Sequence, residues 1–168
     1  MRAADPGVAG RRAVLALALL GLALSAYLTA EHYTGSSTLA CSASGVIDCL
    51  RVTTSPQSVL LGVPVAVWGL LYFAGMTVLA LPPAWRRAGL HRPRVVAAVA
   101  GVAFVLYLLY TELFTLDAVC LWCTAVHVVT AALLLAVLLV DPHAGVTAAP
   151  QPAIQPAARS AGRTAERG

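Results

Sequence analysis

Residues 119–140 read VCLWCTAVHVVTAALLLAVLLV, a stretch of 22 residues without Asp, Glu, Lys or Arg. Three further apolar runs occur at about 13–33, 59–81 and 95–114. Each run is about 20 residues long, the length that a helix needs to cross the ~30 Å hydrocarbon layer of a bilayer. Because backbone polar groups in lipid must pair within their own segment, such runs predict helices. We therefore predict an all-α, polytopic membrane protein with a bundle of four transmembrane helices over residues 13–140.

The arginines indicate how these helices are oriented. The chain has no lysine, and apart from Arg51 its arginines lie in residues 1–12, in the loop 82–94 and in the tail 141–168. Cytoplasmic loops carry the excess of Lys and Arg, so both tails and this loop are predicted to be cytoplasmic. The tail is rich in Ala and Pro and is expected to be disordered; its charge needs no nucleic-acid partner. An arginine pair before an apolar run also resembles an export signal, but this run is long for one and is expected to remain as the first helix.

All four cysteines fall on the predicted extracytoplasmic side. Cys41 and Cys49 lie in the loop 34–58 between the first two helices, and Cys120 and Cys123 form a C-x-x-C pair at the start of the last helix. In bacteria this side of the membrane is the oxidising compartment, where disulfides form and persist. Four cysteines at one membrane face are not what scattered core residues give.

The C-x-x-C pair is suited to thiol exchange. Residues three apart on a helix share a face, so the sulfurs of Cys120 and Cys123 can pair or exchange. We expect Asp117 to cap the last helix, which makes Cys120 the third helical residue. The unpaired N–H groups of a helix N-terminus stabilise a thiolate, and the thiolate is the species that attacks disulfides.

Three other interpretations of the cysteines stay open from their positions alone. Two structural disulfides staple the outer face, the four sulfurs bind zinc, or the C-x-x-C pair belongs to an unreactive core. The spacings C-x7-C and C-x2-C are not the usual pair of zinc knuckles, so no metal is expected. A disulfide-stapled membrane protein with a structural role is the main alternative to an enzyme.

The arrangement of spans and cysteines resembles the vitamin K epoxide reductase family, from about residue 19 to 140. Three segments carry the resemblance beyond the cysteines: CLRVTTS at 49–55, LGVPVAVWG at 61–69 and CLWCTAVH at 120–127. The DsbB-type quinone reductases also have four spans and two cysteine pairs, but their C-x-x-C lies in the first outer loop. This chain has the reverse order, which favours the vitamin K epoxide reductase architecture.

Two positions depart from the animal members of that family. They have an asparagine near the start of the second span, where this chain has Val65, and a tyrosine one turn after the C-x-x-C pair, where it has His127. Both differences favour plain quinone reduction over epoxide reduction.

The resemblance implies an electron relay through all four cysteines. A reduced partner attacks Cys41 of a Cys41–Cys49 disulfide. Cys49 then attacks Cys120 of a C-x-x-C bridge, and the released Cys123 reduces a quinone lodged among the helices. Each step needs an attacking thiolate and a leaving thiolate. The loop is expected to move Cys49 toward Cys120.

Two polar residues are candidates for holding the quinone. His127 lies one turn after Cys123 on the same helix face, although it also fits the role of a packed core histidine. Ser55 is a candidate too, but Ser55 followed by Pro56 is also typical of a helix N-cap and first residue. On that pattern the second helix is predicted to begin near Pro56, with its first turns loosened at 62–64.

The function that the resemblance implies is a membrane thiol–quinone oxidoreductase that supports disulfide bond formation. It oxidises an extracytoplasmic DsbA-like or thioredoxin-like protein. Because the sequence shows no thioredoxin-like domain, this partner is expected to be separate. Abundant Ala and Arg without Lys indicate a GC-rich genome, which slightly favours menaquinone over ubiquinone as the quinone. The predicted location is the cell inner (cytoplasmic) membrane, with the active cysteines on the extracytoplasmic side.

Overall fold

The computed structural model describes residues 6–35, 41 and 45–140, and the predicted disordered tail 141–168 lies outside them. The long helices are α1 (Pro6–Thr34), α3 (Val65–Ala80), α5 (His91–Thr111) and α6 (Leu121–Val140). Because α1 begins at Pro6, much of the predicted tail 1–12 belongs to this helix.

Among the described residues, three segments are long and apolar enough to cross a membrane: Gly7–Thr34, His91–Leu116 and Leu121–Val140. These helices agree with a multi-pass membrane protein that is mostly helical. The remaining helix, α3, is apolar but only 16 residues long. At 1.5 Å per residue it spans about 24 Å. The count of four transmembrane helices therefore stays a prediction.

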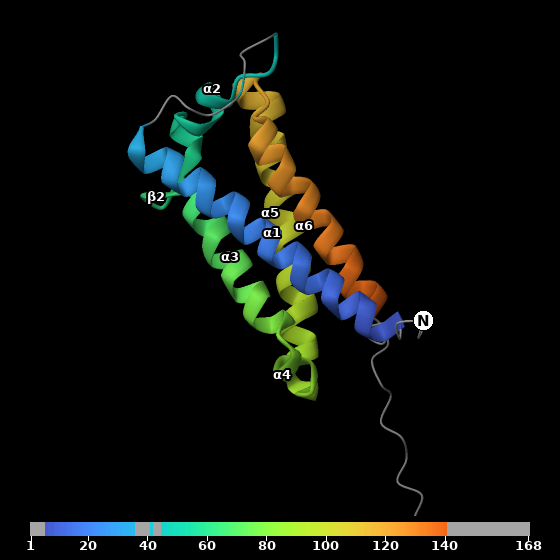
Figure 1. Ribbon diagram of the computed structural model, residues 1–168. Coiled ribbons are helices and arrows are strands. Elements are labelled where there is room, and N and C mark those ends of the chain that lie inside the picture. The colour runs from blue at the N-terminus through green and yellow to red at the C-terminus, as the bar shows by residue number, and fades with distance from the viewer. Residues whose placement is uncertain (1–5, 36–40, 42–44, 141–168) are drawn as a thin grey trace, which may run out of the picture.

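The helices pack around α1. Figure 1 shows α1 between α3 and α6, and α5 packs mainly against α6. The main core cluster takes residues from all four helices: Val14, Ala18, Phe73, Met76, Ala80, Ala98, Val129, Leu133 and Val137. Two glycines allow close approach, because a Cβ atom at Gly21 would overlap the ring of Phe73 and one at Gly101 would overlap Tyr72. Small residues at such contacts are typical of helices that associate in membranes.

The second long helix does not begin near Pro56, and that prediction is wrong. Pro56–Ser58 forms a single 3-10 turn, η1, and the chain then makes a hairpin of two short strands, β1 (Val59–Leu60) and β2 (Val63–Pro64). The two residues between the strands, Leu61 and Gly62, have φ of 55° and 77°. Positive φ at both positions is typical of a tight hairpin turn and incompatible with a helix. Helix α3 begins only after Pro64.

The prediction that Asp117 caps the last helix is also wrong. Helix α5 continues into a π-turn, η3 (Glu112–Leu116), and Asp117 ends this turn with φ of 47°. The N–H of Ala118 donates to the carbonyl oxygen of Glu112 at 3.2 Å, which closes the turn. Helix α6 begins four residues after Asp117, so the carboxylate has no helix N-terminus to cap.

A buried arginine joins α3 to α5 at the end of the bundle that lies opposite Asp117 and the start of α6. Two short helices, α4 (Pro82–Trp85) and η2 (Ala88–Leu90), connect them. Arg94 in α5 donates from Nε and Nη2 to the carbonyl oxygen of Leu79, at 3.1 and 3.0 Å. Its guanidinium lies 3.6 Å from the centroid of the Trp85 ring. These contacts satisfy one of the carbonyl groups that the C-terminus of α3 leaves unpaired.

Candidate functional site

The outer loop is fixed against the segment that precedes α6. Ile47 and Val119 form a parallel β-bridge. The N–H of Asp48 donates to the carbonyl oxygen of Val119 at 3.1 Å, and the N–H of Val119 donates to that of Val46 at 2.8 Å. The loop and the end of the last helix hairpin therefore lie side by side, as Figure 1 shows at the end of the bundle that carries α2.

The bridge leads directly into a short helix that carries one loop cysteine. This helix, α2, runs Cys49–Thr53. Its N-cap is Asp48, whose carboxylate accepts from the N–H of Arg51 at 2.9 Å. A side-chain acceptor at this position satisfies an otherwise unpaired N–H. Cys49, the first residue of α2, is joined to Cys41 by a disulfide with the two Cα atoms 6.0 Å apart.

All four cysteines lie in one apolar cluster. Cys49 and Cys120 are both buried, and the cluster also contains the following residues: Cys41, Val52, Leu116, Ala118, Trp122 and Cys123. Cys120 and Cys123 are free thiols. The loop motion expected from the sequence is thus small, because Cys49 already packs in the cluster that holds Cys120. The disulfide also occupies two of the four sulfurs that a zinc site needs.

Cys120 precedes α6 rather than standing third in it. The N–H of Thr124 donates to the carbonyl oxygen of Cys120 at 2.8 Å, which is the first turn of the helix. The N–H of Cys123 donates to the Cys120 sulfur at 3.3 Å. This is the contact that an N-cap side chain makes with the third helical residue. The sulfur of Cys120 therefore takes the capping position that the sequence assigned to Asp117.

The same contacts favour the thiolate of Cys120. The hydrogen bond from the Cys123 thiol lowers the pKa of Cys120, and the backbone N–H of Cys123 lowers it further. Burial and the charge of Glu112 act in the opposite direction. The net result is a pKa of Cys120 below its ordinary value. The sequence predicted that N–H groups at the helix terminus would stabilise a thiolate at Cys120. In the structure the Cys123 thiol contributes most to this stabilisation, and backbone N–H groups add to it.

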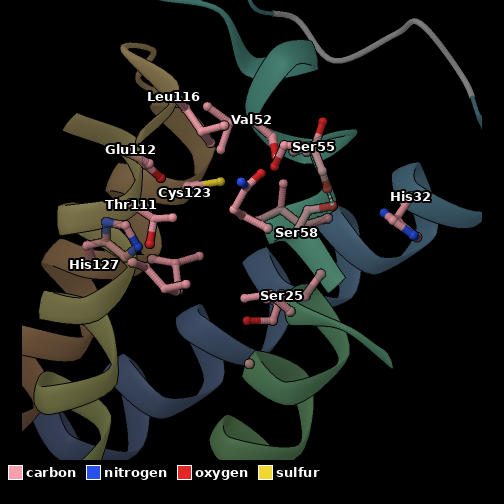
Figure 2. Close-up of a pocket in the computed structure, with 18 of the residues that line it drawn as sticks. Ser25, His32, Val52, Ser55, Ser58, Thr111, Glu112, Leu116, Cys123 and His127 are labelled. Atoms are coloured by element: carbon pink, nitrogen blue, oxygen red, sulfur yellow. Dashed lines mark hydrogen bonds between the residues drawn. The ribbon is translucent and has the colours of Figure 1, made fainter. Parts of the chain in front are cut away.

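A cavity with mostly apolar walls lies beneath the cysteine cluster (Figure 2). Its volume is about 120 Å³, close to the ~150 Å³ of an engineered cavity that binds benzene. Cys123 and both candidate quinone ligands, His127 and Ser55, line it. Figure 2 shows Cys123 and His127 on one side and Ser55 on the other. Val65, which stands where animal relatives have asparagine, also lines it, so the wall is apolar there.

The hydroxyl of Ser55 does not cap a helix as the sequence suggested. Ser55 precedes the turn η1, with Pro56 at its first position, but its side chain makes no capping hydrogen bond. Instead the hydroxyl donates to the carbonyl oxygen of Val52 at 2.9 Å. Ser55 is nevertheless buried and lines the cavity, so its oxygen remains available as an acceptor.

Glu112 is a polar residue of the cavity wall that the sequence analysis did not select. It is 4% exposed, and its Oε2 atom has no hydrogen-bond partner among the described residues. The Nδ1 atom of His127 is also buried without a partner. The sequence analysis assigned no role to Glu112. An available signal was a carboxylate within an apolar run, eight residues before Cys120.

Within residues 6–35, 41 and 45–140, no group of three or more His, Cys, Asp or Glu side chains is arranged to hold a metal ion. The site therefore consists of a disulfide, a pair of free thiols and a ring-sized cavity. The chain matches the model of the vitamin K epoxide reductase family over residues 12–138, which is most of its length.

Proposed function

The chain belongs to the vitamin K epoxide reductase family, and we propose that it oxidises an extracytoplasmic DsbA-like or thioredoxin-like protein and reduces a membrane quinone. Family membership gives membrane thiol–disulfide oxidoreductase activity, and the family in general works with quinones and thioredoxin-like partners. One observation carries the finer proposal. The four cysteines share one cluster, and one of them, Cys123, lines a ring-sized apolar cavity.

The arrangement of the cysteines supports a relay. The Cys41–Cys49 disulfide and the Cys120/Cys123 pair lie in one apolar cluster, so electrons can pass between the two pairs by thiol–disulfide exchange. A stapled membrane protein needs no cavity beside its cysteines, whereas Cys123 lines one. This cavity favours the enzyme over the stapled membrane protein.

The relay uses ordinary thiol–disulfide exchange until the cavity is reached. A partner thiolate attacks Cys41 and releases Cys49, and a second partner thiol completes the partner's disulfide. The Cys49 thiolate attacks a Cys120–Cys123 bridge at Cys120, which releases Cys123. Cys41 then attacks Cys49, which restores the loop disulfide and leaves Cys120 as the second thiol. Each exchange moves two electrons inward and needs only that the attacking sulfur reaches its target.

The cavity residues fit a quinone head group. A quinone accepts two electrons and two protons, which the C-x-x-C pair and nearby acids supply when it is bound. The wall offers a hydrogen-bonding group at His127 and a hydroxyl oxygen at Ser55. Val65 offers none, which supports quinone reduction over epoxide reduction. Menaquinone is the favoured quinone from composition alone.

We also propose that α3 is the fourth transmembrane helix. It packs along α1 in the same bundle as the three longer segments. Outward-facing residues Leu71 and Val78 are 59% and 62% exposed, as expected for side chains that face lipid. A hydrophobic stretch shorter than the ~30 Å hydrocarbon layer is accommodated by local thinning of the bilayer. Together with the arginine pattern, a fourth span supports our proposal that the cysteines lie on the extracytoplasmic side and both tails in the cytoplasm.

The experiment that tests the function supplies a reduced DsbA-like protein and each quinone in turn to the purified protein in lipid. Quinol formation and partner oxidation should proceed together at one quinol per disulfide, and Cys123→Ala should abolish both in steady state. Leu139→Ala, a change on the outside of α6, is the matched control and should retain activity. Absence of quinol formation by the wild type with menaquinone and with ubiquinone would overturn the proposal.

A further inference from the structure

Glu112 is the first residue of the π-turn η3 and lies at the upper wall of the cavity (Figure 2). The side chain is 4% exposed, and Oε2 has no hydrogen-bond partner in the described part of the chain. Buried polar atoms that serve only the fold are nearly always hydrogen-bonded. A carboxyl group at membrane depth with a free oxygen is expensive to keep, which points to a functional role.

The surroundings of Glu112 place it against the reactive sulfurs. The carboxyl group of Glu112 interacts electrostatically with the backbone N–H of Cys120 and with the sulfurs of Cys120 and Cys123. Figure 2 shows the carboxyl group beside the sulfur of Cys123. Glu112 continues α5 and is the first residue of the π-turn η3. Such turns recur at functional sites.

No cation neutralises this carboxyl group in the described residues. From α6 and the residue before it, the titratable groups that face Glu112 are the two thiols and His127. From α1, His32 lies on the far side of the cavity in Figure 2. Helix α2 packs against η3, and its charged residue Arg51 is exposed. The lining residues of α3 carry no charge.

We propose that Glu112 is the proton carrier of the thiol–quinone centre: it takes the proton of Cys123 and passes it to a quinone oxygen. This role rests on the proposed quinone reduction. The backbone N–H of Cys123 donates to the Cys120 sulfur at 3.3 Å, which favours Cys120 as the thiolate of the pair and leaves Cys123 as the thiol. Oxidation of the pair therefore has to release one proton from Cys123 inside a mostly apolar cavity.

The step balances as follows. The Cys120 thiolate and the Cys123 thiol lose two electrons and form the S–S bond, and the quinone gains these two electrons. The S–H bond of Cys123 breaks, and its proton moves to Oε2 of Glu112 and then to one quinone oxygen. A second proton enters from water and completes the quinol at the other oxygen. Glu112 ends as the carboxylate that it was at the start.

Glu112→Gln tests this role because it keeps the shape and the carbonyl acceptor but carries no transferable proton at neutral pH. Quinone reduction should fall by a factor on the order of 10² or more, as for other positioned acid–base groups. Glu112→Asp should restore most of the rate with a displaced pH profile. Asp117→Asn removes a nearby negative charge without touching the cavity and should stay within about threefold of wild type, a small fraction of the effect of a lost acid–base group.

A second readout separates proton transfer from assembly of the site. Fully oxidised protein mixed with reduced partner in the absence of quinone performs only thiol–disulfide exchange. Glu112→Gln should oxidise the partner in this single turnover at the wild-type rate. A wild type that exchanges thiols but reduces no quinone overturns the proposed function and this role together. A wild type that reduces quinone beside an equally active Glu112→Gln protein, with the same pH profile, overturns only the proton carrier.

An infrared difference spectrum keeps the test decisive if Glu112→Gln fails to fold. The spectrum of reduced minus oxidised wild-type protein should contain a shift in a carboxylate stretching band, because the carboxylate of Glu112 faces a thiol in one state and a disulfide in the other. Glu112→Asp, which retains a carboxylate, should move this band, and Asp117→Asn should leave it unchanged. A redox difference spectrum without a carboxylate band, or with one that Glu112→Asp does not move, overturns the proposal.

Discussion

The two ends of the helical bundle each bury a charged side chain and treat it in opposite ways. At the end with α4, Arg94 is 2% exposed, donates to the carbonyl oxygen of Leu79 and lies over Trp85. At the cysteine end, Glu112 is 4% exposed and has an unpaired oxygen. Arg94, whose charge is paired by these contacts, stabilises the connection between the helices. A buried charge without a partner, as at Glu112, costs stability and points to a chemical function.

Backbone conformation separates the two ends in the same way. Every described residue with positive φ lies in the loops of the cysteine end: Gly35, Gly45, Leu61, Gly62 and Asp117. Leu61 and Asp117 are not glycines, so each carries a conformational cost on the order of 1–3 kcal/mol. Such conformations gather at functional sites because surrounding contacts must hold a particular geometry. Here Leu61 lies in the turn of the hairpin, and Asp117 ends the π-turn on another side of the cavity.

The largest effect on stability is expected at the satisfied end. Arg94→Ala removes the donor from the Leu79 carbonyl oxygen and the cation from the Trp85 ring, and should lower the free energy of unfolding by about 2–4 kcal/mol. Arg94→Lys should lose part of this, because an ammonium group cannot reproduce the planar two-point contact. Chemical denaturation in detergent measures both. The exposed Arg92→Ala is the control, and an equal loss there would remove the distinction between the ends.

At the cysteine end, the next effect concerns activity rather than stability. His127→Ala removes a polar group with an unpaired Nδ1 atom from the cavity wall. If His127 binds a quinone oxygen, kcat/KM for quinone should fall roughly 5–30-fold, which corresponds to a loss of about 1–2 kcal/mol of binding free energy. Val128→Ala, on the exposed side of α6, should leave the value unchanged. Equal kinetics for both variants would return His127 to a packing role.

A smaller effect is expected when the two loop cysteines are compared. The variant Cys41→Ser/Cys123→Ser leaves only Cys49 and Cys120, whereas Cys49→Ser/Cys123→Ser leaves only Cys41 and Cys120. Mild oxidation should cross-link the first several-fold faster, since Cys49 is fully buried in the cluster that holds Cys120 and a bridge needs Cα atoms within about 7 Å. Gel mobility after thiol blocking reports the rates. Inverted rates would exchange the roles of the two loop cysteines.

The long helices were predictable from the sequence because length and hydropathy alone determine them. The boundaries were not. The apolar run at 59–81 contains both a hairpin and a helix, since Val59, Leu60 and Val63 are as apolar as the residues of α3. A hydropathy profile carries no information on backbone angles, so it does not reveal the positive φ of Leu61 and Gly62 in the hairpin turn. Pro64 marks the true boundary, and a proline is equally compatible with the first turn of a helix.

At the site, the cysteines and His127 could be identified as candidates from the sequence, but the groups that surround them could not. A motif reports residue types and spacing, whereas capping by the Cys120 sulfur depends on where α6 begins. Glu112 was visible as a charge near the end of an apolar run. Its place in the cavity wall, at the start of a π-turn, is not revealed by sequence periodicity. Contacts between the loop and the segment before α6 are tertiary, so no local pattern predicts the bridge of Ile47 with Val119.

The smallest effect on stability is expected at Glu112, the buried acid of the cysteine end. Glu112→Gln should change the free energy of unfolding by less than about 1 kcal/mol, because the amide keeps the size of the side chain and a carbonyl oxygen, and removes a charge that lacks a buried partner. A slight gain in stability fits the same argument, since a group retained for chemistry is often replaceable without cost to the fold. Chemical denaturation should be measured beside Arg94→Ala in one detergent. A loss for Glu112→Gln as large as that for Arg94→Ala would mean that both ends bury their charge for the fold.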